Sequence, residues 1–419
     1  MSATPASGTP QWDGSGSSRI PFAVYTSEQL HLRELERFFY RAHWNYVALE
    51  AELPHPGDFK RTVVGQRSVI VVRDKAGQVQ VLENVCAHRG MQFCRERHGN
   101  RSEFICPYHQ WSYNLQGDLQ GVPFRRGVRQ DGKVNGGMPA DFDMAHHGLT
   151  RLKVATRGGV VFASFDHSVE SLEDFMGPAV LHYFDRLFDG RKLTILGYNR
   201  QRIPGNWKLM QENIKDPYHP GLLHTWFVTF GLWRADNKSQ LVMDAHHRHA
   251  AMVSTRGASG EAGQVTQVSS FKDKMQLHDP RFLDIVPEPW WGGPTAVMTT
   301  LFPSVVLQQQ VNSVSVRHIQ PDGHGAFNFE WTHFGFEDDD AAMTQRRLRQ
   351  ANLFGPAGFV SADDGEVIEF SQRAFASKPQ HHTLAELGGR EVGDTDHMVT
   401  ETLIRGMYRY WRAVMEAEP

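Results

Sequence analysis

The sequence predicts an α+β protein of two domains, in which a small all-β domain is inserted into a larger domain of helices and antiparallel strands. The chain has 419 residues, which is more than one hydrophobic core usually serves. Short β-rich runs alternate with Gly, Asp and Asn turns over residues 45–165, a pattern typical of small antiparallel sheets. Helical and strand patterns mix over residues 166–419, which indicates an α+β domain.

The individual elements follow from local patterns. Residues 1–18 are rich in Ser, Gly, Pro and Thr, so they are expected to form a disordered tail. Apolar residues at helical spacing predict a helix over 26–44, and residues 19–44 are assigned with it to the larger domain. The predicted strands lie at 68–72, 79–82, 158–165, 296–306 and 313–320, the predicted helices at 206–223, 340–354 and 400–417, and a long Gly-rich loop at 121–137.

The composition excludes several classes of protein. Hydrophobic residues make up 40% of the chain and charged residues 22%, with a formal net charge of −3. These are globular values, and without a basic stripe nucleic acid is not an expected partner. No apolar run approaches the roughly 20 residues that span a bilayer, and the first residues lack a signal-peptide pattern. The three cysteines are an odd number suited to a reducing compartment, so a cytoplasmic protein without membrane contact is expected.

Two short segments each combine a cysteine with a histidine: Cys86-Ala-His88 and Cys106-Pro-Tyr-His109. Such ligands could form a structural zinc site or hold a Rieske-type [2Fe-2S] cluster. Zinc sites usually take two cysteines from one segment and two histidines from another, whereas here each segment supplies one of each. The cluster, in which one iron takes both thiolates and the other both imidazoles, requires this mixed pattern. Cys94 has no partner in the sequence and is expected to be a buried thiol.

Residues beside these segments indicate how a cluster would be enclosed. Gly90 follows the first pair and would let backbone amides approach the cluster sulfides, which helps to set a cluster's potential. The aromatic residues Tyr108, Trp111 and Tyr113 would shield its open side. We therefore expect an enclosed cluster at the tips of two β loops.

Residues 206–224 bring carboxylates and imidazoles together in one predicted helix. Asp216 and His219 would share a face, because a helix turns about 100° per residue. His219 and His224 are five residues apart and could bind one metal only if the helix is distorted, which Pro220 between them favours. Two histidines and a carboxylate on one face of an iron leave positions open for O2 and substrate, as in non-heme Fe(II) oxygenases.

The strings CAHRG and CPYHQWSYNLQGDLQGVP resemble the Rieske domain of aromatic-ring-hydroxylating non-heme-iron oxygenases. The resemblance to the large, alpha subunits of this family covers nearly the whole chain, and it implies a Rieske domain inserted into a helix-grip-like catalytic domain. It places the third iron ligand at Asp364 in GPAGFVSADDGEVIEFSQ, with Asp363 as the adjacent alternative. It also matches Asp216 to the family's bridging aspartate, so that His109 of one subunit would face Asp216 of the next.

The resemblance implies two cofactors and several partners. The implied ligands are Cys86, His88, Cys106 and His109 for the [2Fe-2S] cluster, and His219, His224 and Asp364 for a mononuclear Fe(II). The chain has no G-x-G-x-x-G between a strand and a helix, so electrons from NAD(P)H are expected to arrive through a ferredoxin and a ferredoxin reductase. The expected assembly is an alpha3 ring, or an alpha3beta3 complex with a small beta subunit.

Within the family, NVCAHRGMQFCRERHGN and VPEPWWGGPTAVMTT are most similar to the salicylate 5-hydroxylase large subunits, which implies O2-dependent hydroxylation of an aromatic acid, salicylate, to gentisate. Met398 stands where terephthalate-type relatives carry an arginine suited to a second carboxylate. A buried substrate carboxylate must be paired or hydrogen-bonded, and Arg317 or the amides of Gln308 and Gln310 are candidates for this role. The expected substrate residues are Asn213, Ile214, Met252, Gln308, Gln310 and Arg317.

Three other functions stay open from the sequence. One is cis-dihydroxylation of another aromatic acid, of the anthranilate, benzoate or terephthalate type. Another is a zinc-stabilised binding protein without a redox role. The third is an electron carrier whose second metal site is degenerate.

Overall fold

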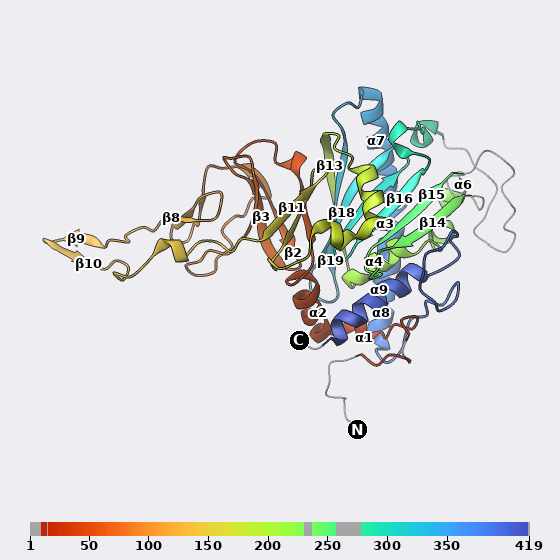
Figure 1. The fold of residues 1–419 in the computed structure, drawn as a ribbon, viewed down its shortest axis with the longest axis horizontal. Helices are drawn as coiled ribbons and strands as arrows, with labels where there is room; N and C mark the ends of the chain where they lie inside the picture. The colour runs from red at the N-terminus through yellow and green to blue at the C-terminus, as the bar shows by residue number, and fades with distance from the viewer. Residues whose placement is uncertain (1–9, 15, 230–236, 257–277, 418–419) are drawn as a thin grey trace, which may run out of the picture. The chain divides into compact units, whose positions relative to one another are not determined.

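The computed structural model describes residues 10–14, 16–229, 237–256 and 278–417. The chain forms two compact units, one of residues 39–169 and one of residues 1–38 together with 170–419. The smaller unit is therefore an insertion in the larger one (Figure 1). The predicted α+β fold class, with an inserted all-β domain, is confirmed.

The smaller unit consists of short antiparallel strands. Its sheets have the strand orders β4-β3-β2-β5, β1-β12-β11, β6-β7-β8 and β10-β9. The strands are β1 Asn45–Leu49, β2 Asp58–Val64, β3 Arg67–Arg73, β4 Val79–Glu83, β5 His98–Asn100, β6 Phe104–Ile105, β7 Ser112–Tyr113, β8 Leu119–Gly121, β9 Val128–Gln130, β10 Lys133–Asn135, β11 Lys153–Arg157 and β12 Val160–Ser164, with short 3-10 helices at Glu50–Glu52 and Met144–His146. The strands predicted at 68–72, 79–82 and 158–165 are confirmed as β3, β4 and β12.

The predicted loop at 121–137 is wrong in part, because it contains the hairpin β9–β10. The two residues of its turn, Asp131 and Gly132, have φ angles of 50° and 77°. Asp-Gly is the sequence that favours this left-handed turn between two strands. The turn residues that suggested an irregular loop therefore mark a hairpin.

The core of the smaller unit lies beneath the two cysteine-histidine segments. Phe59, Ile70 and Leu82 of the four-stranded sheet form one buried cluster with Cys86 and Cys106. Each of these five residues is at most 3% exposed. The hydrophobic core therefore holds both cysteines in place.

The larger unit is organised around a seven-stranded antiparallel sheet of order β13-β19-β18-β17-β16-β15-β14. The strands are β13 Leu193–Ile203, β14 Lys238–Met243, β15 Ala250–Thr255, β16 Ala296–Leu301, β17 Val305–Gln310, β18 Ser313–Pro321 and β19 Phe327–Phe336. The strand predicted at 313–320 is confirmed as β18, whereas the one predicted at 296–306 is wrong as a single strand. The chain reverses so that Leu301 pairs with Val305, because Pro303 has no amide hydrogen for a central strand.

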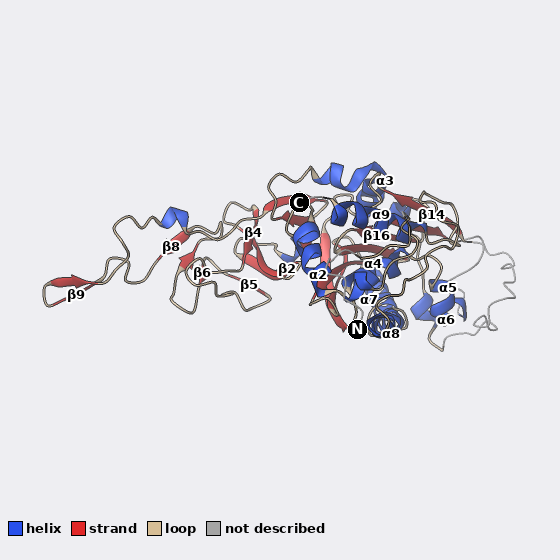
Figure 2. Cartoon of the chain, turned by 90° about the horizontal axis from the view of Figure 1, so that it is seen from below, coloured by secondary structure: helices blue, strands red, loops and turns tan. Residues whose placement is uncertain are grey.

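Helices cover both faces of this sheet. On one face, Arg186 of α3 donates to the Gln309 side chain at 2.8 Å. Lys215 of α4 donates to Thr300 at 2.7 Å. Thr300 and Gln309 point to opposite sides of the sheet, so α3 and α4 lie on opposite faces. Figure 2 shows α3 and α8 on opposite sides of the strands. The helices are α1 Ala23–Thr26, α2 Glu28–Glu34, a π-helical turn Leu35–Phe39, α3 Leu172–Leu187, α4 Trp207–Lys215, α5 Pro220–Leu223, α6 Thr225–Thr229, 3-10 helices Pro280–Leu283 and Pro289–Trp291, α7 Ala341–Phe354, α8 Ser361–Ser377 and α9 Thr402–Glu416.

The N-terminal segment differs from its prediction. The helix expected over 26–44 is divided at Ser27, whose hydroxyl caps α2 by accepting from the Leu30 amide, and helical structure ends at Phe39. Residues 1–9 and 15 of the expected tail lie outside the described residues. Ser17, however, is buried and donates to the Arg405 carbonyl at 2.8 Å, so this end of the tail is ordered.

The helices predicted at 340–354 and 400–417 are confirmed as α7 and α9. Within the described part of the chain, every helix is too short or too polar to cross a bilayer.

Candidate metal centres and active site

The predicted helix over 206–223 is interrupted where the first metal centre forms. Helix α4 ends at Lys215, and Asp216 has extended φ and ψ angles of −96° and 100°. Asp216 precedes Pro217, and a proline disfavours helical geometry in the residue before it. Helical structure resumes as α5, with His219 as its N-cap and His224 as its C-cap. The expected distortion is confirmed, and the prediction that Asp216 and His219 share one continuous helix is wrong.

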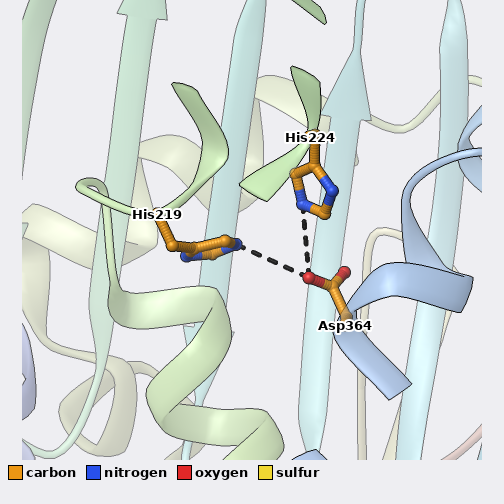
Figure 3. Close-up of side chains that lie close together, drawn as sticks. All are labelled: His219, His224 and Asp364. Atoms are coloured by element: carbon orange, nitrogen blue, oxygen red, sulfur yellow. Dashed lines mark ion pairs between the residues drawn. The ribbon is translucent and has the colours of Figure 1, made fainter. Parts of the chain in front are cut away.

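This break lets His219 and His224 converge on Asp364 from α8 (Figure 3). Asp364 Oδ1 lies 3.5 Å from His219 Nε2 and 3.2 Å from His224 Nε2. One ligand atom from each residue lies within 4.8 Å of the other two. Asp364 and His224 are buried and His219 is half-buried. The three side chains therefore form a ready set of donors for one metal ion.

The electrostatics of the three residues suit a cation. Burial favours the neutral form of Asp364, but His219 and His224 more than offset this and hold the pKa of Asp364 well below its usual range. Burial lowers the pKa of His219, yet Asp216 and Asp364 raise it to about 9. A carboxylate that is already ionised is ready to bind metal, and the negative field that attracts a proton to His219 also attracts a metal ion.

The two adjacent acids of α8 have different positions. Asp363 Oδ2 lies 3.2 Å from His224 Nδ1, the nitrogen that faces away from Asp364. A carboxylate on the far nitrogen of a metal-binding histidine sets its tautomer and orientation. Asp364 therefore has the geometry of the third ligand, and Asp363 has the geometry of a residue that orients His224.

Asp216 lies beside the other histidine. Its Oδ2 lies 3.6 Å from His219 Nδ1, and its Oδ1 accepts hydrogen bonds from the amides of Tyr218 at 2.8 Å and His219 at 3.3 Å. Asp216 thus sits on the side of the imidazole opposite Asp364. This is the position of a residue that acts on the metal through its ligand.

The two cysteine-histidine segments fold into similar loops. In the first, the Cys86 amide donates to the Met91 carbonyl at 2.9 Å and the Gly90 amide to the Cys86 carbonyl at 2.9 Å. The second repeats both bonds at 2.9 and 2.8 Å with Cys106 in the place of Cys86. Gly90 and its counterpart Gln110 have positive φ angles of 71° and 57°. The Gly90 amide closes the loop, and the expected approach of other backbone amides to the cluster sulfides stays a prediction.

The imidazoles of these loops lie side by side. The rings of His88 and His109 have centroids 4.5 Å apart, and His88 stacks on Trp111 at 4.7 Å. Burial, followed by the charge of His109, lowers the pKa of His88, which favours the neutral form that binds metals. His88 Nδ1 is buried and has no hydrogen-bond partner. A buried nitrogen without a partner fits a metal ligand.

The thiols lie on the buried side of the loops. The Cys86 sulfur and the Tyr113 hydroxyl are 3.2 Å apart, and burial followed by contact with Cys86 raises the pKa of Cys106. Trp111 and Tyr113 are buried. Tyr108 is 55% exposed and its ring lies 3.8 Å from that of His109, and its expected shielding of a cluster stays a prediction. Cys94, as expected, is a buried thiol.

The arrangement of these four ligands disfavours a single zinc ion. One tetrahedral zinc would bring all four donor atoms within about 4 Å of one another. Of the described residues, only the triad of His219, His224 and Asp364 brings three donor atoms within 4.8 Å of one another. Two thiolates and two imidazoles held farther apart fit the longer two-iron cluster.

A cavity of the larger unit lies beside the segment that carries His219. Its empty volume, including the open mouth, is about 820 Å³, and its lining is mainly apolar. Pro217 and Pro220, which flank His219 in the chain, form part of the wall. Of the expected substrate residues, Met252 and Gln310 line this cavity, and Met398 lies there too. The remaining expected substrate residues, Asn213, Ile214, Gln308 and Arg317, do not line it.

Those four residues lie outside the cavity wall. Asn213 donates to Asp364 Oδ1 at 3.1 Å, and Gln308 donates to Gln310 at 2.5 Å. Arg317 is 3% exposed and packs its guanidinium 3.7 Å from the centre of the Trp331 ring. Burial lowers the pKa of Arg317 to about 9. Within the described residues no carboxylate forms an ion pair with Arg317, so its charge is poorly compensated.

One cavity-lining arginine and one buried lysine were not identified from the sequence. Arg256 lines the cavity at the end of β15, where no motif marks it. Lys215 is 1% exposed and burial lowers its pKa to about 7; it bonds Gln211 and Thr300, at 2.8 and 2.7 Å. The position of Lys215 directly before Asp216, on the side of the helix that faces the sheet, could have drawn attention to it.

Comparison with known proteins agrees with this geometry. Residues 43–131 match the Rieske [2Fe-2S] domain family, and residues 184–417 match the ring hydroxylating alpha subunit (catalytic domain) family. The chain is 75% identical to the salicylate 5-hydroxylase large oxygenase component of Ralstonia sp over 97% of this chain and 96% of the relative. It is 39% identical to the terephthalate 1,2-dioxygenase terminal oxygenase component subunit alpha 2 of Comamonas sp, over 97% and 98% of the two chains.

The fold also agrees with solved structures. A naphthalene 1,2-dioxygenase from Rhodococcus sp. bound to indole superposes with a TM-score of 0.79 at 24% identity, over 96% of this chain and 95% of that one. The family matches set aside the alternative of a zinc-stabilised binding protein. The chain belongs to the large, alpha subunits of the Rieske-type ring-hydroxylating oxygenases, enzymes that carry a [2Fe-2S] cluster and a mononuclear iron and hydroxylate aromatic compounds.

Proposed function

We propose that this chain is the large subunit of an enzyme that hydroxylates salicylate at carbon 5 to give gentisate. The observation that carries the proposal is the 75% identity to a salicylate 5-hydroxylase large oxygenase component along nearly the whole chain. The relatives named as dioxygenases of terephthalate and anthranilate are 39% and 40% identical. Met398 in the cavity wall agrees with a substrate that has a single carboxylate.

The proposal assigns the ligands of both metal groups. Cys86, His88, Cys106 and His109 hold the cluster, and His219, His224 and Asp364 hold the iron. When bound, the iron supplies the site of O2 activation and the cluster supplies the electrons. The chain itself positions the aromatic ring in an apolar cavity and keeps water from the buried side of the triad.

Asp216 would connect the cluster of one copy with the iron site of the next. In the proposed assembly, an alpha3 or alpha3beta3 ring, His109 of one copy faces Asp216 of the next, which holds the iron ligand His219. A small beta subunit, a ferredoxin and a ferredoxin reductase are the proposed partners, and NAD(P)H is used only through the reductase. The cytoplasmic location expected from the sequence stays a prediction.

Asp216→Asn is expected to lower hydroxylation by about 10- to 100-fold while both metal groups remain bound. The amide keeps the size of the side chain but loses the charge that orients His219, and residues behind metal ligands typically contribute about 10- to 100-fold. Single-turnover oxidation of the reduced cluster, followed in visible light, measures the step directly. Asp338→Asn, an exposed acid, is the control, and an Asp216→Asn enzyme with the parent rate would contradict the route.

Arg317→Leu is expected to raise the Michaelis constant for salicylate by about tenfold or more, and Gln310→Leu by less. A substrate carboxylate would compensate the buried charge of Arg317, either directly or through the Gln308–Gln310 pair, and buried charges require such partners. Steady-state kinetics of both variants provide the measurement. Arg202→Leu removes an exposed arginine of β13 and is the control. If both Leu variants have the same Michaelis constant for salicylate as the parent enzyme, neither residue binds the carboxylate.

The experiment that tests the substrate is turnover with salicylate, anthranilate, benzoate and terephthalate, using a compatible reductase system. Gentisate as the main product, with one oxygen atom added, supports the proposal. A cis-diol product would instead support dihydroxylation. Rapid turnover of another acid and none of salicylate would overturn the substrate assignment.

A further inference from the structure

A cluster of tyrosine and tryptophan side chains lies beside α4 and takes no part in the proposed metal or substrate binding. Tyr408 and Trp411 of α9 are 0% and 1% exposed, and their ring centroids are 6.4 Å apart. Trp12 packs on both, at 6.2 Å from Tyr408 and 6.0 Å from Trp411. Because Trp12 is partly exposed, the cluster leads from the interior to the surface.

Helix α4 connects this cluster to the iron triad. The Tyr408 hydroxyl donates to the carboxylate of Glu212 in α4. The charge of Asp216 acts on Glu212, and Asp216 in turn lies 3.6 Å from His219 Nδ1. A series of close neighbours therefore runs from the iron ligand to the surface tryptophan.

Two of the three aromatic residues have a carboxylate in place to take a proton. Glu212 accepts from Tyr408, and Glu34 Oε1 accepts from Trp411 Nε1 at 2.7 Å. Burial raises the pKa of Glu212 to about 7, while its interaction with Tyr408 lowers it, so near neutral pH part of the population is ionised and can accept a proton. A tyrosine loses its phenol proton when it is oxidised, and a base in contact makes that loss reversible.

We propose that Tyr408, Trp411 and Trp12 form a path that removes an oxidising equivalent from the iron site when O2 is activated without substrate in the cavity. This inference rests on the proposed iron ligands. O2 activation supplies the oxidant, which would otherwise attack nearby side chains. A core of aromatic residues with a purely structural role is the competing explanation, since rings at these distances also pack favourably.

The electrons and protons of the proposed step balance. Tyr408 gives one electron to the oxidant at the iron, and its O–H bond breaks as the proton passes to Glu212. Trp411 or Trp12 then returns an electron to the phenoxyl, and Glu212 returns the proton. At the surface a small thiol gives one electron to the Trp12 radical cation and releases its proton to water, and two of the resulting thiyl radicals combine into one disulfide.

The test uses the holoenzyme, reduced with dithionite and mixed with O2 in the absence of an aromatic acid. Freeze-quenched paramagnetic resonance is expected to show a tyrosyl or tryptophanyl radical in the parent enzyme. Tyr408→Phe, which removes only the hydroxyl, should lower the radical yield by about fivefold or more. It should also reduce several-fold the number of substrate-free turnovers before inactivation. Tyr183→Phe is the matched control, because Tyr183 likewise donates to a side-chain oxygen, that of Gln240 at 2.9 Å, but lies on α3, outside the path.

Peptide mass spectrometry gives a second measurement on the same samples. Oxidation products at Trp12 should accumulate in the parent enzyme when no thiol is present, and should decrease in Tyr408→Phe. If Tyr408→Phe fails to fold, Trp12→Phe at the partly exposed end decides, because it should lengthen the lifetime of the radical. Equal radical yield and equal inactivation in Tyr408→Phe and the parent enzyme would overturn the path.

The failure of the proposed iron site would look different. An enzyme with that fault would hold the cluster but bind no additional mononuclear iron, as iron analysis of the same samples would show, and both proposals would be overturned. An enzyme that binds the additional iron but forms no aromatic radical overturns the path alone.

Discussion

Asp364→Ala is expected to remove the mononuclear iron and abolish hydroxylation while the [2Fe-2S] cluster remains. Asp364 Oδ1 is the one oxygen that approaches both His219 and His224, at 3.5 and 3.2 Å. Without it, two imidazoles lack the carboxylate that completes the facial triad. Hydroxylation should fall by more than about 100-fold, because residues that only orient a ligand already contribute about 10- to 100-fold. Iron analysis and visible absorption of the same sample measure the two metal groups separately.

Asp363→Ala is the matched control for this prediction. Asp363 Oδ2 lies 3.2 Å from His224 Nδ1, so its loss should weaken iron binding by about 10- to 100-fold without abolishing activity at high iron concentration. Equal losses in the two variants would show that both acids bind the metal. Full iron content in Asp364→Ala would show that the triad is not the iron site.

Cys106→Ser is expected to remove the cluster and, with it, the visible colour of the protein. Cys106 is 1% exposed and lies in the hydrophobic core of the inserted unit. Loss of the cluster would leave its ligand site empty next to this core. Metal binding contributes to folding free energy where the ligands are buried. Hydroxylation should be undetectable, and the smaller unit should unfold at lower temperature, as circular dichroism and visible absorption would show.

The control for this variant is Cys94→Ser. Cys94 is also buried, and burial raises its pKa to about 11, which keeps it a neutral thiol. Its serine variant should keep the colour and most of the activity. A coloured Cys106→Ser protein, or a colourless Cys94→Ser protein, would show that the cysteine assigned to the cluster is the wrong one.

Some of the centres could be predicted from the sequence because their ligands are neighbours along the chain. Cys86 and His88 are two residues apart and Cys106 and His109 three apart, so loop geometry alone brings each pair together. The same holds for His219 and His224, whose helix was expected to be distorted at Pro220. The position of the helix break at Asp216 could also have been predicted from the sequence, because Asp216 precedes Pro217 and a proline disfavours helical geometry in the residue before it.

The sequence by itself determined the α+β class, the inserted β unit and the two groups of local ligands, since these depend on short-range spacing and turn chemistry. Only the tertiary structure decided between Asp363 and Asp364, separated Met252 and Gln310 in the cavity from Arg317 outside its wall, and placed Tyr408 against Glu212. Those contacts join residues far apart in the chain. Asp364 of α8 meets His224 at the end of α5, and Tyr408 of α9 meets Glu212 of α4. Which side chains meet over such separations depends on how helices and sheet pack, and spacing along the sequence holds no record of that packing.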